Sequence, residues 1–340
     1  MDTLDKLVNW FLHSPIFDDE AYLEYYSATK KGPEYPEITA YAISLSCVLY
    51  ERKKDRKFLD RAEICAKFMK KISKNGGVPC LRDNLLYSFD TEVYVSSVFD
   101  LYSLTKKESY LNEAEKSLEW LYSLWDRRPF AAVDKLPEKK DWYHVPSVHL
   151  AKLVIALMKA SKYLRDEKYM ETALELLDKY KQLQKEDGGF RINEGSNAIM
   201  VHPHCYATEG FLYAYYTSKR REFLEVAKKA SNWLCKMQNS DGSFYWWYDA
   251  EKEVEHRDRQ ERVKATDAAA QATRIWKLLG VNREGIEKAY RYLDSELKDN
   301  GLRLYNIESM RESVHSWPTF FYIHSLTLPF GQIEYCREIF

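Results

Sequence analysis

The amino-acid sequence predicts an all-α fold, a single (α/α)6 toroid of six helical hairpins that spans residues 1–340. Three observations lead to this prediction. Apolar residues recur with the period of an amphipathic helix in twelve segments. These segments alternate between a charged, amphipathic kind and a kind that is apolar nearly all round. The connections between them alternate between short and long in the same order, as expected for hairpins arranged in two concentric rings.

The six amphipathic segments are expected to form the outer ring, with one face on the core and one in water. In residues 55–73, for example, Phe58, Ala62 and Met69 fall on one stripe, and Lys, Arg and Glu residues lie opposite. The six segments are residues 3–13, 55–73, 107–124, 166–184, 220–238 and 283–297.

The other six segments have no polar face, so protein must cover both of their sides. They are expected to form the inner ring, and they are residues 35–51, 89–104, 146–164, 203–218, 265–279 and 315–328. No Pro- or Gly-rich linker divides the chain, which favours one domain.

Loop length predicts where a functional site lies. Connections from an inner to an outer helix are short, as in residues 52–54 and 105–106, whereas connections from an outer to an inner helix are long, as in residues 125–145 and 239–264. Long loops in compact domains are usually functional. All the long loops gather at one rim, above the N-terminal ends of the inner helices, and we expect a cavity there.

A sequence repeat marks the start of several long loops. Residues 184–190 (QKEDGGF) and 238–244 (QNSDGSF) share one pattern, and weaker copies occur at residues 75–79 (NGGVP) and 299–301 (DNG). Each copy is followed by a loop and then by a polar cluster that opens an inner helix. Such self-similarity indicates a repeat architecture.

Composition excludes several classes of function. A formal net charge of −1 gives no basic surface for nucleic acid, and no apolar run approaches the length of a transmembrane helix. The six cysteines form no CxxC pair, which favours a reducing compartment over a disulfide framework. The first residues contain no secretion signal. We expect a cytoplasmic protein without nucleic-acid partners or membrane spans, and the sequence leaves its oligomeric state open.

A polar residue occupies an equivalent position at the start of each of the six inner helices, and these residues are Glu37, Asp90, Ser147, His204, Asp267 and His315. Two positions later stand Thr39, Glu92, His149, Tyr206, Ala269 and Trp317. Helix capping is one explanation, since Ser and Asp are preferred N-caps and acidic residues favour the first turn. Capping is the better explanation for Ser147, and it is as well supported as function for Asp90 and Asp267. The two histidines favour a lined cavity, because histidine is not a preferred cap.

Carboxylates gathered at one concave rim could provide acid–base chemistry. Different burial separates the pKa values of such groups, so one can act as general acid and another as general base or nucleophile. We therefore predict Asp90, Asp267 and Glu37 as catalytic residues. The predicted substrate-binding residues are Tyr41, Glu92, His149, His202, His204, Tyr206, Trp246, Trp247, Gln271, His315 and Trp317. For the tryptophans in the fifth loop, packing of that loop is an equally good alternative to stacking on a ligand.

No metal or cofactor is predicted. His202 and His204 could begin a zinc site, but no helical HxxxH and no paired cysteines support one. The chain also has no glycine-rich phosphate loop and no GxSxG segment, so nucleotide-dependent and serine-hydrolase functions are not expected. Glu209, deeper in its helix, is expected to pair with Arg274, because an unpaired buried carboxylate is costly.

The repeat resembles a known motif. Residues 184–190 and 238–244 are similar to the QxxDG(S/G)(W/F) hairpin motif of α/α-toroid proteins, which include six-hairpin glycosidase-like proteins, terpenoid cyclases and prenyltransferase β-subunits. Further segments look like a poorly characterised prokaryotic six-hairpin family that is linked with polysaccharide metabolism, and they are residues 35–41 (YPEITAY), 89–91 (FDT), 267–276 (DAAAQATRIW) and 315–317 (HSW). The resemblance covers the whole chain as architecture and implies a carbohydrate-active role.

The resemblance to terpenoid toroids is more distant. Triterpene cyclases use a DxDD motif, and the sequence contains none. Prenyltransferase β-subunits bind zinc through Asp, Cys and His. Only residues 204–206 (HCY) resemble the segment near that site, and no matching Asp-x-Cys occurs.

Three hypotheses on function follow. The first is a glycoside hydrolase with Asp90 and Asp267 as the acid–base pair. Its substrate would be an oligosaccharide, and oligosaccharides that contain uronic acids are included. Glu37, His204 and His315 would then orient the substrate. The second is a sugar epimerase or polysaccharide lyase in which the two histidines move protons. The third is a terpenoid- or isoprenoid-binding or cyclase-like toroid, or a binding protein without catalysis.

Overall fold

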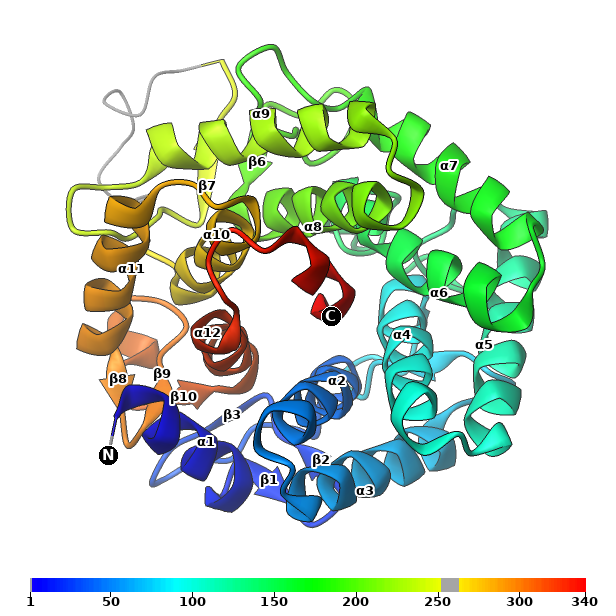
Figure 1. Cartoon of the computed structure of the whole chain (residues 1–340), viewed down its shortest axis with the longest axis horizontal. Coiled ribbons are helices and arrows are strands. Elements are labelled where there is room, and N and C mark those ends of the chain that lie inside the picture. Colours follow the sequence, from blue (N-terminus) through cyan, green and yellow to red (C-terminus); the bar gives the residue numbers. More distant parts are fainter. Residues whose placement is uncertain (1, 252–262) are drawn as a thin grey trace.

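Twelve α-helices form two concentric rings in the computed structural model, which describes residues 2–251 and 263–340 (Figure 1). The outer helices are α1 (Thr3–His13), α3 (Arg56–Ile72), α5 (Glu108–Arg127), α7 (Lys168–Lys181), α9 (Arg221–Met237) and α11 (Arg283–Ser295). The inner helices are α2 (Pro36–Lys53), α4 (Ser88–Thr105), α6 (Val154–Leu164), α8 (Val201–Ser218), α10 (Thr266–Leu279) and α12 (Ser316–Thr327).

The inner ring is closed. Each inner helix contacts the next, from α2 through α4, α6, α8, α10 and α12, and α12 returns to α2. Helices α4 and α10 therefore lie across the ring from each other (Figure 1). Side chains from both rings share one large apolar core. The predicted all-α toroid of six hairpins is confirmed.

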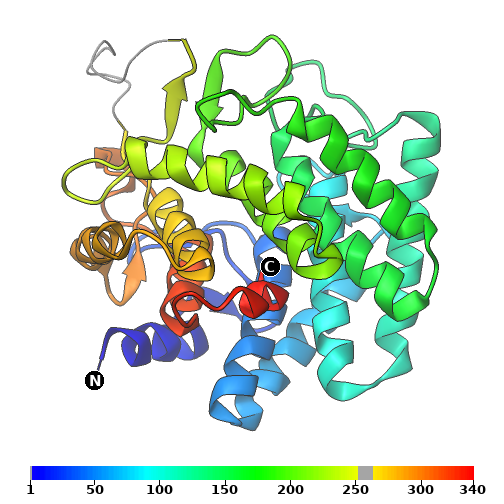
Figure 2. The same ribbon diagram turned by 45° about the horizontal axis from the view of Figure 1, so that its top comes forward.

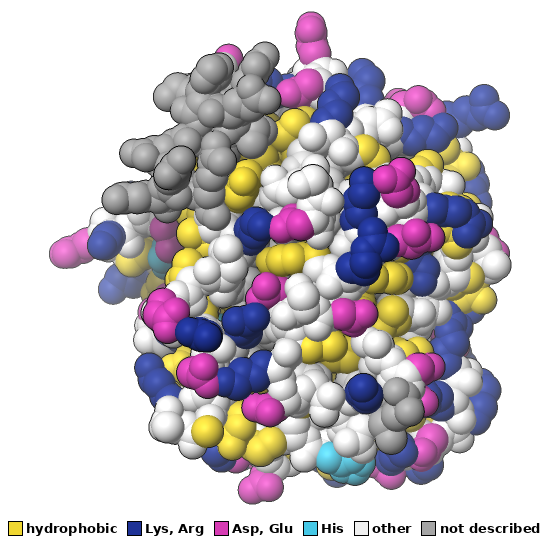
Figure 3. Space-filling view, turned by 90° about the vertical axis from the view of Figure 1, so that its left-hand side faces the viewer, with side chains coloured by type: hydrophobic (Ala, Val, Ile, Leu, Met, Phe, Trp, Pro, Cys, Tyr) yellow, Lys and Arg dark blue, Asp and Glu magenta, His cyan; other side chains and the backbone are white. Residues whose placement is uncertain are grey.

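The two rings differ in burial as their sequences predict. In α2, residues 36–49 are all buried, whereas α3 buries one stripe that includes Phe58, Ala62 and Met69. Figure 3 shows one outer side of the molecule, where Lys and Arg side chains are interspersed with Asp and Glu. This is the pattern of helices with one face on the core and one in water.

The third inner helix differs from the prediction at its start. Residues Val148–Leu153 form the 3-10 helix η1, and the α-helix begins only at Val154. Helix α8 packs closely on η1 at Gly210, where a β-carbon would lie 2.3 Å from the carbonyl oxygen of Ala151. Over six residues the periods of the two helix types differ too little for a sequence pattern to separate them. The 3-10 helices η4 (Glu308–Met310) and η5 (Ile333–Glu338) follow later in the described chain.

Short antiparallel strands, which the sequence does not predict, form within the long loops, and two of the pairings, β3 with β10 and β6 with β7, join different loops. β1 (Phe17–Asp18) pairs with β2 (Ala21–Tyr22), β4 (Val78–Pro79) with β5 (Leu86–Tyr87), and β6 (Ala198–Met200) with β7 (Trp247–Asp249). A four-stranded sheet has the order β3 (Tyr25–Tyr26), β10 (Val314–His315), β9 (Gly301–Leu302) and β8 (Leu297–Lys298). Pairing of β3 with β10 joins the first long loop to the last. Figure 2 shows β6 and β7 projecting beyond the helices.

The repeated Asp-Gly segments are turns that contact the next outer helix. Gly188 has a φ of +101°, and a β-carbon there would lie 2.1 Å from the carbonyl oxygen of Lys229 in α9. The side-chain amide of Gln184 donates to the carbonyl groups of Gly188 and Val226. Residues 238–244 repeat these contacts with α11. The repeat therefore fixes the spacing of neighbouring outer helices.

The last residues of the sequence lie at the centre of the ring (Figure 1). The ring of Phe340 packs against Tyr41, Phe321 and His324, and its carbonyl oxygen accepts a hydrogen bond of 2.6 Å from Nζ of Lys152. This segment therefore fills part of the barrel axis.

Within residues 2–251 and 263–340, no helix has the length and apolar character needed to cross a bilayer. All six cysteines are free thiols, and all except Cys235 are buried. The five buried ones pack in the apolar clusters as small apolar side chains.

Candidate active site

A cavity of about 530 Å³ opens where the long loops meet the N-terminal ends of the inner helices. The inner helices contribute Glu37, His202, Tyr206, Asp267 and Trp317 to its lining. The long loops add further lining residues, among them Glu24, Arg82, Trp142, Tyr143, Trp246 and Tyr305. The cavity therefore lies where the loop lengths predict it.

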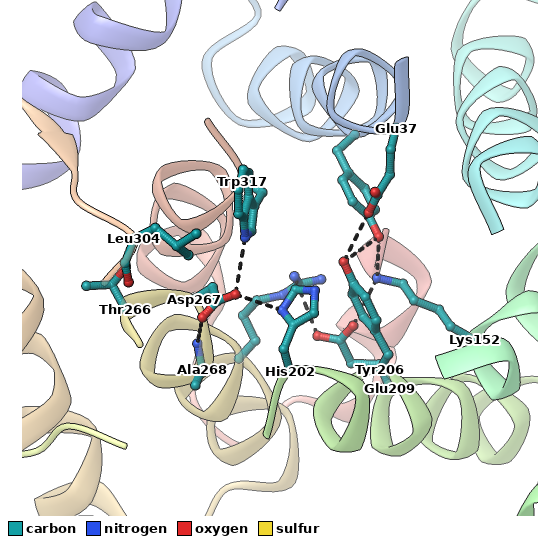
Figure 4. A network of polar contacts seen from close by, with 12 residues as sticks. Glu37, Lys152, His202, Tyr206, Glu209, Thr266, Asp267, Ala268, Leu304 and Trp317 are labelled. Atoms are coloured by element: carbon teal, nitrogen blue, oxygen red, sulfur yellow. Dashed lines mark hydrogen bonds and ion pairs between the residues drawn. The ribbon is translucent and has the colours of Figure 1, made fainter. Parts of the chain in front are cut away.

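Asp267 lies in the first turn of α10 and forms the polar centre of one wall (Figure 4). Its Oδ2 atom is 3.1 Å from Nδ1 of His202 and accepts a hydrogen bond of 3.1 Å from the indole of Trp317. Its Oδ1 atom accepts one of 2.7 Å from the backbone N–H of Ala268. Burial opposes ionisation, but the interaction with His202 and these hydrogen bonds outweigh it, so the pKa of Asp267 is lowered from its usual range. Asp267 is therefore a carboxylate at neutral pH.

Glu37, in the first turn of α2, lines another wall of the cavity. Three tyrosine hydroxyls donate to its carboxylate, from Tyr35 at 2.9 Å, Tyr143 at 3.4 Å and Tyr206 at 3.3 Å. The residue is only 6% exposed. Its hydrogen-bonding groups thus come from three different parts of the chain.

Asp90, in the first turn of α4, is fully buried behind the cavity wall. Its Oδ1 atom accepts a short hydrogen bond from the hydroxyl of Tyr143, and its Oδ2 atom has no partner among the described residues. Burial raises the pKa of Asp90 well above its usual range, and the nearby charge of Glu37 raises it further. The surroundings of Asp90 therefore favour its protonated form, whereas those of Asp267 favour the carboxylate.

Tyr143 connects the carboxyl groups of Glu37 and Asp90, and it is not among the residues predicted from the sequence. Its hydroxyl contacts both Glu37 and Asp90. Its ring is stacked between Tyr87 and His149, with centroid distances of 4.9 Å and 5.3 Å. The sequence indicates only that Tyr143 lies in the long loop of residues 125–145, and this does not distinguish it from the neighbouring Trp142.

Arg82 is a second lining residue that the sequence analysis missed. Its guanidinium forms an ion pair of 2.6 Å with Glu24 and lies over the ring of Tyr35, 4.8 Å from the centroid. It comes from the turn between β4 and β5. A single arginine in a polar loop gives no sequence signal of this position.

Three histidines predicted to bind substrate do not line the cavity. His204 lies between α8 and α9, where Nδ1 accepts from the N–H of Phe190 and Nε2 is 3.2 Å from the carbonyl oxygen of Ala230. His149 lies behind Tyr143, and His315 contacts Trp317 and β3. Burial lowers the pKa of His204 and of His149 to about 3 and that of His315 to about 4, so all three are neutral.

Other predicted residues lie deeper than the cavity or beside it. The hydroxyl of Tyr41 donates to that of Tyr206 at 3.0 Å. Glu92 accepts from the N–H of Ala156 at 3.1 Å, and burial raises its pKa to about 8. Gln271 is fully buried between the helices, with no hydrogen-bond partner in the described part of the chain. None of these lines the cavity, and neither does Trp247, whereas Trp246 does.

A buried ion network lies beneath Tyr206 (Figure 4). Glu209 pairs with Arg274 at 3.5 Å, which confirms the predicted pair, and also with Lys152 at 3.1 Å. Nζ of Lys152 is 3.3 Å from the hydroxyl of Tyr41, which connects it to Tyr206 and so to Glu37. Burial lowers the pKa of Lys152 to about 8.

The structure contains no cluster of three or more His, Cys, Asp or Glu side chains that could hold a metal ion within the described ranges. His202 and His204, the pair considered for zinc, have different partners. The first contacts Asp267 in the cavity, and the second contacts Ala230 of the outer ring.

No protein-family model matches the chain, and no curated protein matches it in sequence. Solved structures match it over nearly its whole length. A sugar epimerase from a ruminal bacterium has a TM-score of 0.76 at 11% identity, over 96% of this chain and 98% of its own. Cellobiose 2-epimerase from Bacillus thermoamylovorans has a TM-score of 0.77 at 9% identity, over 95% and 98%. Unsaturated glucuronyl hydrolase from a Bacillus species has a TM-score of 0.69 at 14% identity, over 96% and 94%.

At these identities the likeness is one of fold. The chain shares the six-hairpin (α/α)6 toroid with sugar epimerases and unsaturated glucuronyl hydrolases. The resemblance that the Gln-x-x-Asp-Gly repeat implied is confirmed at this level.

Proposed function

We propose that the protein is a carbohydrate-active enzyme and that glycoside hydrolysis is its reaction. Sugar-processing enzymes with the same fold support a saccharide ligand. The cavity supports it independently, because aromatic rings beside polar groups are the usual surroundings of a bound sugar.

The opposite pKa shifts of two carboxyl groups are the observation that carries this proposal. Burial raises the pKa of Asp90, and the surroundings of Asp267 lower its pKa. The two residues open α4 and α10, which lie across the ring from each other. Acid–base cleavage of a glycosidic bond uses such a pair, one carboxyl group whose surroundings favour the protonated form and one whose surroundings favour the ionised form.

Asp267 acts as the general base in this proposal. Its carboxylate, held by His202 and Trp317, accepts a proton from a water molecule whose oxygen attacks the anomeric carbon. Asp90 provides the proton that the glycosidic oxygen takes as its bond to that carbon breaks. Because Asp90 is fully buried, Tyr143 acts between it and the sugar: the Tyr143 hydroxyl gives its own hydrogen to the glycosidic oxygen and takes the hydrogen of the Asp90 carboxyl group in exchange across the Oη–Oδ1 contact. Glu37 orients the sugar by accepting hydrogen bonds from it.

Epimerisation is the second candidate, and the contact between His202 and Asp267 favours it. A histidine beside a carboxylate is a suitable base for removing a proton next to a carbonyl group. The histidines first predicted for this chemistry, His204 and His315, lie outside the cavity lining. The second group that transfers a proton would therefore be Tyr143. A polysaccharide lyase would use the same two groups, His202 and Tyr143.

A terpenoid ligand is less well supported. Such a ligand needs a mostly aromatic pocket. Here the carboxylates, histidines and single arginine of the lining are as numerous as its tyrosines and tryptophans. This composition favours a polar ligand with apolar faces.

The test is a product analysis in heavy water. The protein is incubated with panels of oligosaccharides, and we expect new reducing ends for at least one panel member. An isomer of unchanged length that carries deuterium at one ring carbon would indicate epimerisation instead. A chain that alters no saccharide in either way contradicts the proposal of a carbohydrate-active enzyme.

A further inference from the structure

The cavity contains more acidic than basic groups. Five carboxylates line it, and they are Glu24, Glu37, Asp83, Asp141 and Asp267. The possible cations among the described lining residues are Arg82, His144 and His202. The carboxylates outnumber them even when both histidines are protonated. An excess of one sign in a concave site attracts ligands of the opposite sign.

Most of these carboxylates have a basic partner. The contacts are Glu24 with Arg82 at 2.6 Å, Asp141 with His144 at 2.7 Å, Asp267 with His202 at 3.1 Å, and Asp83 with His144 at 3.8 Å. Each of these charges is therefore at least partly compensated within the protein.

Glu37 is the exception. Its hydrogen-bond partners are the hydroxyls of Tyr35, Tyr143 and Tyr206, and none of the ion pairs formed by residues 2–251 and 263–340 includes it. Arg82 lines the same cavity, and its guanidinium pairs with Glu24. A buried anion without a counter-ion is costly, so the site favours a ligand that brings one.

The groups around Glu37 suit an ammonium group. The rings of Tyr35 and Tyr206 line the cavity beside its carboxylate, and Trp317 lies edge-on to Tyr35 with a centroid distance of 6.2 Å. Aromatic faces attract a cation through their quadrupole, and a neighbouring carboxylate adds direct charge attraction.

We propose that the cavity selects a saccharide with a protonated amino group and that Glu37 binds this group. The inference rests on the proposed saccharide site and adds the charge class of its ligand. A uronic acid would bring a carboxylate into a lining that already has an excess of them. An amino sugar would instead provide the missing counter-ion of Glu37.

The test is a titration of the wild-type protein with four disaccharides of the same linkage. They contain glucosamine, N-acetylglucosamine, glucose or glucuronic acid. We expect the glucosamine disaccharide to bind at least about tenfold more tightly than the other three. This preference should weaken from low salt to about 0.5 M salt, because screening reduces charge attraction.

Two variants locate the effect. Glu37→Gln should remove the preference for the amino sugar, and a thermal melt establishes that the variant is folded. Glu51→Gln changes a carboxylate at the other end of the same helix, outside this cavity, and should leave the preference intact. Tighter binding of the neutral or acidic sugar overturns the inference and leaves the saccharide site standing. Absence of binding by all four sugars overturns the inference together with the proposed function.

Discussion

Tyr143 is the residue on which the proposed proton path depends. Its hydroxyl contacts both Glu37 and Asp90, while its ring is held by stacking on Tyr87 and His149. The hydroxyl can therefore be removed without removing the packing. A substitution that removes only this hydroxyl therefore tests the chemical role of Tyr143 separately from the packing of its ring.

Tyr143→Phe should keep the fold and lose most of the activity. The ring contacts remain, so the protein should stay folded, with a loss of about 1–3 kcal/mol because the buried carboxyl group of Asp90 loses its partner, and the link from Asp90 to the cavity is broken. We expect turnover to fall by about 10²-fold, a typical effect of losing proton transfer. Steady-state kinetics and a thermal melt measure the two outcomes, and unchanged turnover would exclude this proton path.

Asp90→Asn should change how stability depends on pH. Burial raises the folded-state pKa of Asp90 well above the usual value of 3.8. Between these two pKa values the folded state holds a proton that the unfolded state has released, so wild-type stability falls as pH rises. The slope is at most about 1.4 kcal/mol per pH unit, and asparagine removes it. Denaturant unfolding at several pH values measures this, and parallel profiles for the two proteins would refute the raised pKa of Asp90.

At the scale of elements, the Asp-Gly turns explain why the repeat exists. Gly188 and Gly242 have φ values of +101° and +91°, and a β-carbon at either would lie within 2.2 Å of a carbonyl oxygen of the next outer helix. Only glycine permits both the conformation and the close approach. The repeated Asp-Gly motif therefore packs neighbouring hairpins together and gives no information about the reaction that the protein catalyses.

Gly188→Ala should destabilise the protein by about 2–3 kcal/mol, because it combines a strained φ with a backbone clash. Gly195→Ala is the matched control. Gly195 has a φ of +76°, but a β-carbon there would meet nothing within 4 Å. The control should cost about 1 kcal/mol, from the conformation alone. Equal losses in chemical denaturation would show that the contact with α9 does not matter.

The helices could be predicted because each ring has its own apolar pattern, which extends over many residues. The strands could not, since a strand of two residues, such as Val314–His315, is too short to have a period. The position of the cavity followed from loop length. The direction in which individual side chains point could not be predicted. His202 faces the cavity, whereas His204, two residues later in the same helix, faces the outer ring. Tyr143 and Arg82 lie in loops, where no period indicates direction.

At the scale of the whole molecule, a buried ion network lies at the centre of the barrel. Lys152, Glu209 and Arg274 come from three consecutive elements of the inner ring, η1, α8 and α10, and all three are at most 1% exposed. The network also reaches Phe340 and, through Tyr41 and Tyr206, the carboxylate of Glu37. It therefore links the interior of the barrel to the cavity wall that contains Glu37.

Glu209→Gln should destabilise the fold by about 3–5 kcal/mol, because it leaves two buried cations without their shared anion. Asp5→Asn removes one partner of an exposed ion pair with Lys53 and serves as the control. That substitution should cost less than about 1 kcal/mol. Guanidinium denaturation of both variants measures the difference. A loss for Glu209→Gln as small as that of the control would mean that the network does not stabilise the barrel.

The measurement that tests the account most directly compares Asp267→Asn with the wild-type protein on any saccharide that the wild type converts. Asparagine keeps the shape of the side chain but cannot accept the proton of an attacking water molecule. We expect turnover to fall by at least about 10²-fold while the variant still binds the same saccharide in a calorimetric titration. Turnover equal to that of the wild type would contradict the account, because the reaction would then not depend on the carboxylate at the centre of the proposed site.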